Sequence, residues 1–234
     1  MAEPEAVIWM RPEHAKAGHG RPAERSRAEL TAAAIGIADR EGLAALSMRR
    51  VAAELGTGPA TLYRYVANRG DLLDLMANAV ASEYELAPAS GDWIADLVGL
   101  GRQARSIMLR HPWLPAVVIS TPVIGPRAVD LLEHVLDVLS EHPAGAAAKL
   151  EAFALLMAVT ATYVQHELSI TAAAQQRQGA YLRHVAEAGG HPRIAALLVE
   201  AASAPDAARP DQFAAMLARV LSGLLPDTPA GCGQ

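Results

Sequence analysis

The sequence predicts an all-α protein, and three observations lead to this: its composition, its helix-capping motifs and its apolar periodicity. Hydrophobic residues make up 52% of the 234 residues, but aromatic residues only 4%. The apolar residues are mostly Ala, Leu and Val, a balance that favours helices because strands are enriched in β-branched and aromatic side chains. Apolar residues recur at helical spacing between Gly and Pro breakers, so we expect a packed helical core.

Four helices are predicted between residue 24 and residue 85, each with its own start signal. Ser26 and Glu29 form a capping box at the first helix, which Gly42 ends. Ser47 is the expected N-cap of a second helix over 48–55, and Pro59 takes the first position of a third over 59–66. The tight glycine-containing turn between these two short helices gives helix-turn-helix spacing. Asn68 caps a fourth helix, with Asp71 as its reciprocal partner. This helix joins the N-terminal head, which contains the helix-turn-helix, to the longer helices of the C-terminal body.

The second half is predicted to be a bundle of longer helices. The loop 111–126 contains four prolines and has room for at most one short helix. The helices 146–174 and 211–225 carry broad apolar stripes that must be covered on more than one side, so they are candidates for a dimer interface. Core helices of a monomer would show the same pattern. The other expected helices cover residues 92–110, 127–141, 178–188 and 192–201.

These elements divide the chain into four parts: a flexible N-terminal arm (1–23), a helix-turn-helix domain (24–80), a helical body with the candidate dimerisation helices (81–226) and a C-terminal tail (227–234). Residues 1–70 hold 10 Lys and Arg against 8 Asp and Glu, while the whole chain has a net charge of −5. A polyanion would therefore bind the head rather than the acidic body. Four arginines of the arm and the first helix are candidates for contacts in a minor groove: Arg11, Arg21, Arg25 and Arg27. A plain disordered tail is an equal alternative.

Enzymatic chemistry finds no support in the sequence. The run Gly99–Ala104 fits a G-x-G-x-x-A dinucleotide fingerprint, but no strand precedes it and no acidic residue lies between Asp96 and Asp130. We interpret Gly99 and Gly101 as close-packing positions in a helix. No metal-ligand spacing and no nucleophile elbow occur, so we expect no catalytic residue, metal or cofactor. The longest uncharged stretches are too short or too proline-rich to span a bilayer, and we expect a cytoplasmic protein without membrane contact.

Several fixed offsets in the head resemble one family. The runs Leu46–Gly56 (LSMRRVAAELG) and Thr61–Val66 (TLYRYV), followed by Asn68-Arg69 and Leu72-Leu73-Asp74, are similar to the DNA-binding domain of TetR (tetracycline-repressor-like) regulators. His111–Leu114 also resembles a loop of some ligand-binding domains of that family. The resemblance covers residues 24–80 and implies a homodimeric, all-helical repressor of a palindromic double-stranded DNA operator, released by a small-molecule effector.

The resemblance also implies which residues contact DNA. Arg49 would reach a base edge, Ser47 and Arg69 would take phosphates, and the third helix would lie in the major groove. The tyrosines could instead pack between helices, and the arginines could be ordinary solvated charges. The implied set is Ser47, Arg49, Pro59, Ala60, Thr61, Tyr63, Arg64, Tyr65 and Arg69.

Effector contacts are expected from the body helices, where an apolar cavity with a few polar groups would take a largely apolar ligand. Core or dimer packing is the alternative for each residue. A ligand-dependent activator, and a helical ligand-binding or interaction protein that does not repress, are the alternative functions. The candidate ligand-binding residues are Arg105, Met108, Trp113, His134, Met157, Thr160, Tyr163 and His166.

Overall fold

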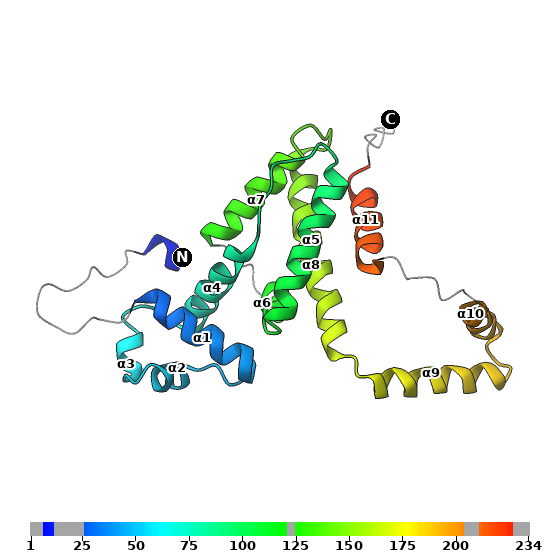
Figure 1. Ribbon diagram of the computed structural model, residues 1–234, viewed down its shortest axis with the longest axis horizontal. Coiled ribbons are helices and arrows are strands. Elements are labelled where there is room, and N and C mark those ends of the chain that lie inside the picture. The colour runs from blue at the N-terminus through cyan, green and yellow to red at the C-terminus, as the bar shows by residue number, and fades with distance from the viewer. Residues whose placement is uncertain (1–6, 12–25, 121–124, 204–210, 227–234) are drawn as a thin grey trace, which may run out of the picture.

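The computed structural model describes residues 7–11, 26–120, 125–203 and 211–226, and within these ranges it contains helices and turns but no strand. The predicted all-α class is confirmed. A head of short helices sits at one end of the molecule and a bundle of longer helices forms the body (Figure 1). The elements are η1 (Ile8–Met10), α1 (Arg27–Glu41), α2 (Met48–Glu54), α3 (Pro59–Leu62), α4 (Arg69–Val80), η2 (Ala81–Glu83), α5 (Trp93–Arg110), α6 (Leu114–Ser120), α7 (Pro126–Val138), α8 (Ala146–Ser169), α9 (Ala172–Glu187), α10 (Pro192–Ser203) and α11 (Gln212–Leu224).

The head helices begin where the capping signals place them. The backbone N–H of Glu29 donates to Ser26 Oγ at 3.1 Å and that of Ser26 donates to Glu29 Oε2 at 2.8 Å, which completes the capping box of α1. Ser47 accepts from the third residue beyond it and so caps α2. Gly56 ends α2 with a φ of +64°, a left-handed conformation that glycine adopts without steric cost. The predicted helix-turn-helix is therefore present.

The third helix is shorter than predicted. It ends at Leu62, and Tyr63 to Tyr65 continue as turns held by bonds such as Tyr65 N–H to the Leu62 carbonyl at 2.9 Å. Leu62 and Val66, four residues apart, are both buried in the core of the head. Asn68 caps α4 as expected, but Asp71 is not its reciprocal partner, because the Asp71 carboxylate accepts from Ala67 N–H at 2.6 Å.

Part of the expected N-terminal arm packs against the head. Ile8 is 0% exposed within the core of the head helices, and Arg11 forms an ion pair with the buried Asp71. Burying an isoleucine contributes about 1.5–3 kcal/mol, which together with the Arg11–Asp71 ion pair favours the packed position of this segment. The prediction of a flexible arm is therefore wrong for residues 7–11. Arg27 begins α1, while Arg21, Arg25 and the predicted tail 227–234 lie outside the described residues.

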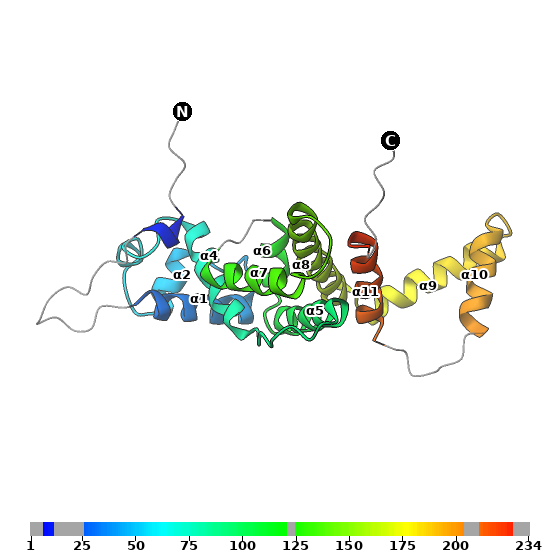
Figure 2. The same cartoon turned by 90° about the horizontal axis from the view of Figure 1, so that it is seen from above.

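The body is built around α8, which packs against α5, α6, α7 and α11. By length and composition alone α8 could cross a membrane; in this structure it packs against these four helices. It ends at Ser169, earlier than predicted, because Thr171 caps a new helix. From there α9 and α10 pack against each other and extend away from the body, and neither has a buried residue (Figures 1 and 2). They form an arm, α9–α10, with large apolar side chains in solvent.

Candidate DNA-binding surface and effector cavity

The helix-turn-helix presents a continuous outer surface made by the start of α2 and by α3. Pro59 and Ala60 are exposed at the start of α3, and Tyr63 just beyond it is 55% exposed. Leu62 points inward and is fully buried, so it anchors the short helix to α1 and α4. Of the nine residues implied to contact DNA, seven are exposed, whereas Thr61 and Tyr65 are half-buried, with Tyr65 packed against the head core.

Two adjacent arginines on α2 have different surroundings. Arg50 donates to Glu41 at 2.7 Å and to Glu54 at 2.8 Å, and Glu54 also accepts from Arg40. The Arg50 hydrogen bonds, set against a smaller effect of burial, lower the pKa of both Glu41 and Glu54. Arg49 is exposed and has no hydrogen bond or ion pair among the described residues. Arg49 is therefore available to an external acceptor, while Arg50 holds α2 to α1.

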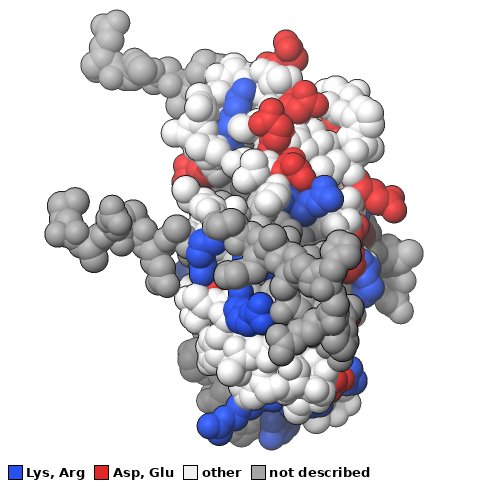
Figure 3. All heavy atoms as spheres, turned by 90° about the vertical axis from the view of Figure 1, so that its left-hand side faces the viewer, with Lys and Arg blue, Asp and Glu red and all other residues white. Residues whose placement is uncertain are grey.

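Two of the expected phosphate contacts also have partners within the head. Ser47 Oγ accepts the N-cap hydrogen bond, which leaves its hydroxyl proton free to donate. Arg69 donates to the Leu43 carbonyl at 3.0 Å with one of its five N–H groups. Both side chains are exposed and can still bind an oxyanion. Seen from the end that carries the head, Lys and Arg gather in the lower part of the molecule and Asp and Glu in the upper part (Figure 3).

The body contains a cavity of about 310 Å³ between α4, α5, α6, α7 and α8. Its wall is almost entirely hydrocarbon, with Tyr84 the only side chain of the described lining that carries an oxygen or nitrogen. Burial raises the pKa of Tyr84, so its hydroxyl stays protonated and able to donate. The described lining is Ala77, Val80, Ala81, Tyr84, Ile107, Leu114, Val118, Ala128, Leu131, Phe153, Ala154, Met157 and Ala158.

Of the eight predicted ligand-binding residues, only Met157 lines this cavity. Trp113 is buried at the junction with the head, where its Nε1–H donates to Asp39 at 2.7 Å. Arg105 pairs with Glu167 and lies over the Tyr163 ring, 5.9 Å from its centroid, on the side of the bundle next to α11. The remaining four also lie outside the described lining: Met108 is buried in the core, Thr160 donates to a backbone carbonyl of its own helix, His134 is half-buried on α7 and His166 is exposed.

Five of the twelve described lining residues that the sequence reasoning missed are alanines. Two pairs lie four residues apart: Ala77 on α4 with Ala81 at the start of η2, and Ala154 with Ala158 on one face of α8. Facing surfaces of small residues leave space that larger side chains would fill. Such pairs are the sequence signal on the cavity wall, but the sequence does not show which helices face each other.

Helix α4 connects the cavity to the DNA-binding surface. Its C-terminal half contributes Ala77 and Val80 to the cavity wall, and its N-terminus lies directly after the turns that follow α3. Asn78, on the same helix, accepts a hydrogen bond from the Arg127 N–H at 2.9 Å and so caps α7, which forms another wall. A Cβ at Gly125 would lie 2.7 Å from Asn78 Oδ1, so this contact requires glycine. Helix α4 therefore runs from the cavity wall to the head.

The fold and these two sites define a class: a helix-turn-helix protein with a separate helical domain built around a small-molecule cavity. Residues 30–76 match the family described as bacterial regulatory proteins, tetR family. Residues 87–227, more than half of the chain, match the tetracyclin repressor-like C-terminal domain. The chain belongs to the TetR family of transcriptional regulators.

Individual relatives agree with this assignment. The chain is 50% identical over 109 residues to the HTH-type transcriptional repressor DrrR1 of Streptomyces coeruleorubidus, across 46% of this chain and 40% of the relative. It is 33% identical over 147 residues to an HTH-type transcriptional regulator of Saccharopolyspora erythraea, across 62% and 61%. The chain thus spans less than two thirds of each of these relatives.

A solved structure covers nearly the whole fold. Apo ActR from Streptomyces coelicolor superposes with a TM-score of 0.75 at 28% identity, over 88% of this chain and 97% of that chain. The same protein in complex with actinorhodin gives a TM-score of 0.73 at 27% identity, over 89% and 99%.

Proposed function

We propose that this protein is a homodimeric transcriptional repressor that binds a palindromic operator through α2 and α3 and leaves it when a small, largely apolar effector fills the cavity. The observation that carries the proposal is the position of α4. It forms one wall of the cavity and its other end adjoins the surface that presents Arg49 and α3. Because operators lie on the chromosome, the protein acts in the cytoplasm.

On DNA, the exposed surface fits the major groove with α3 leading. Arg49 reaches a base edge, where a guanidinium pairs bidentately with guanine, and Arg64 is the second base-edge candidate. Ala60 and Thr61 offer methyl groups to thymine, while Pro59 starts the helix at the groove floor. Phosphate contacts fall to Ser47, Arg69 and the tyrosines Tyr63 and Tyr65 on either side of α3.

The effector is proposed to be largely apolar because of what the cavity offers. A volume of about 310 Å³ lies at the lower end of the usual range of ligand pockets. The single hydroxyl of Tyr84 can orient one polar group of a ligand whose remaining surface meets hydrocarbon. The complex of the structural relative ActR with actinorhodin supports the proposal that this chain also binds a ligand.

Dimerisation is proposed through α8 and α11, with the arm α9–α10 next to them. One side of α8 and α11 forms the body core, but Leu150 and Leu168 on α8 are exposed. In the arm, Tyr181, Leu197 and Val199 are all more than 60% exposed. Apolar surface of this extent is typical of an interface, and a second copy of the chain would cover it.

Release follows from a shift between two arrangements. An effector binds better to the arrangement in which α4 stands away from α8, and the equilibrium moves towards it. Since α4 carries the head, the two copies of α3 then no longer match half-sites about 34–36 Å apart. At saturating effector, the equilibrium between the two arrangements shifts by the ratio of the effector's affinities for them.

The test is selection of duplexes from a random pool by the purified chain, followed by release from the selected duplex. We expect an enriched palindrome whose complex survives moderate salt and dissociates on addition of 1-naphthol, a small apolar probe with one hydroxyl. The variant Ala158→Phe, which fills part of the cavity, should bind the same duplex and resist the probe. A pool without enrichment would contradict the DNA-binding proposal. Release of the wild type and of Ala158→Phe at the same probe concentration would contradict the cavity as the effector site.

A further inference from the structure

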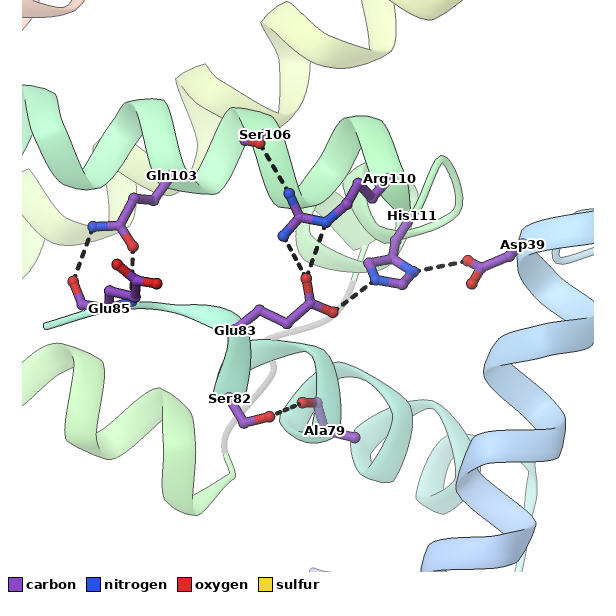
Figure 4. A network of polar contacts seen from close by, with 9 residues as sticks. All are labelled: Asp39, Ala79, Ser82, Glu83, Glu85, Gln103, Ser106, Arg110 and His111. Carbon is purple, nitrogen blue, oxygen red and sulfur yellow. Dashed lines mark hydrogen bonds and ion pairs between the residues drawn. The ribbon is translucent and has the colours of Figure 1, made fainter.

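A network of charged side chains joins the head to the body at His111. This residue ends α5, and its imidazole lies between two carboxylates from different parts of the chain (Figure 4). Nδ1 is 2.9 Å from Asp39 Oδ1, near the end of α1, and Nε2 is 2.9 Å from Glu83 Oε1, in η2 after α4. The imidazole is therefore a bridge between α1, the end of α4 and α5.

The bridge requires a proton on each ring nitrogen. A neutral imidazole carries one N–H, so it can donate to one carboxylate and must turn a lone pair towards the other. Only the imidazolium donates to both. The side chain of His111 is 12% exposed, which leaves little room for water to replace a lost hydrogen bond.

The surrounding groups balance this positive charge. The groups that face His111 are Asp39 from α1 and Glu83 from η2, while Arg110 from α5 donates to Glu83 and Trp113 donates to the same Asp39 oxygen. Burial by itself would raise the pKa of Glu83, but hydrogen bonds from Arg110 and His111 outweigh it and lower that pKa. With His111 protonated, its imidazolium and the Arg110 guanidinium balance the two carboxylates. Without the proton, one carboxylate faces the lone pair of a ring nitrogen instead of an N–H group.

We propose that protonated His111 is a latch that fixes the head against the body, so that operator binding weakens as pH rises through its deprotonation. The inference rests on the proposed binding of a palindrome by two heads. Two half-sites are bound at once only if both heads hold one orientation, and a loosened junction must be ordered again when DNA binds. His111 is thus a positioning residue, since it acts on DNA through α1 and α4.

The first test reads the protonation state directly and does not depend on DNA. In ¹⁵N-histidine-labelled full chain at about pH 6, where exposed imidazoles are also protonated, we expect one imidazole whose two N–H protons are both shielded from solvent exchange. Loss of that signal in His111→Gln assigns it, and His184→Gln, an exposed histidine on α9, is the matched control. A neutral His111 ring at this pH overturns the latch, whether or not the protein binds DNA.

The second test measures the affinity for a duplex selected from a random pool by the wild-type chain, using fluorescence anisotropy between about pH 6 and about pH 8.5. The wild type and His184→Gln should lose about three- to tenfold in affinity across this range, from one charged hydrogen bond in a partly exposed site. His111→Gln should bind weakly and without this pH dependence. Asp39→Asn, which keeps the shape of the acceptor, should reduce the pH dependence in the same way. A pH dependence in His111→Gln equal to that of the wild type overturns the proposal, whereas failure to select any duplex overturns the DNA-binding function instead.

Discussion

Two glycines on α5 should respond in opposite ways to the same substitution. Gly99 and Gly101 both lie inside the helix, where Gly→Ala gains about 0.5–1 kcal/mol of helix stability. A Cβ at Gly99 meets no atom within 4 Å. A Cβ at Gly101 would overlap the side chain of Leu217 on α11 and lie 3.4 Å from Leu156 on α8. Only Gly101 is therefore the close-packing position that the sequence suggested for both.

The expected magnitude follows from that overlap. Leu217 and Leu156 are both fully buried, so the Leu217 side chain cannot swing aside without moving its neighbours. Extra methyl groups in a packed core cost about 1–3 kcal/mol. Because the gain in helix propensity is common to both sites, Gly101→Ala should be less stable than Gly99→Ala by about 1–3 kcal/mol.

Urea unfolding followed by circular dichroism measures this difference. Gly99→Ala should have a slightly larger free energy of unfolding than the wild type. In thermal unfolding, a gap of about 2 kcal/mol between the two variants would separate their melting temperatures by about 4–8 °C. Equal stability of the two variants would refute the close packing of α5 on α11 at Gly101.

Two further predictions concern the head. Ile8→Ala should destabilise the protein by about 2–4 kcal/mol because the side chain is fully buried. Met10→Ala, whose side chain is 76% exposed in the same segment, should change stability by less than about 0.5 kcal/mol. Thermal unfolding compares the two, and equal melting temperatures would show that residues 7–11 do not pack as described. The lowered pKa of Glu83 means that its ion pairs stabilise the fold above the usual value of 4.5, and that this stability is lost as pH falls through the lower, folded value. Glu83→Gln should therefore flatten the acid side of the stability profile; an unchanged profile would contradict the pairing of Glu83 with Arg110 and His111.

The parts of the fold that local chemistry determines could be predicted from the sequence. Capping residues such as Ser26, Ser47 and Asn68 act within one turn of their own helix, so their positions fix helix starts. The end of α3 could not be placed this way. Leu62 and Val66 lie four residues apart and would share one face of a continued helix as well, so their burial does not locate its end.

The candidate effector site was harder to predict for a physical reason. Periodicity shows that a helix face is apolar, but not whether the neighbouring helix fills the space in front of it. Trp113 and Thr160 were reasonable ligand contacts as buried polar side chains, yet Asp39 and the Leu156 carbonyl already satisfy their hydrogen bonds. A cavity forms where small residues of several helices lie at the same height in the bundle, and only the three-dimensional packing shows this.

The most direct test of the account compares two neighbouring arginines on α2. Arg49 has no partner among the described residues, whereas Arg50 is held by Glu41 and Glu54. In anisotropy titrations of the selected duplex, Arg49→Gln should lose about 1–3 kcal/mol of binding free energy, and Arg50→Gln should stay within about twofold of the wild type. Equal affinity of Arg49→Gln and wild type, or a larger loss in Arg50→Gln, would contradict the proposed DNA-binding surface.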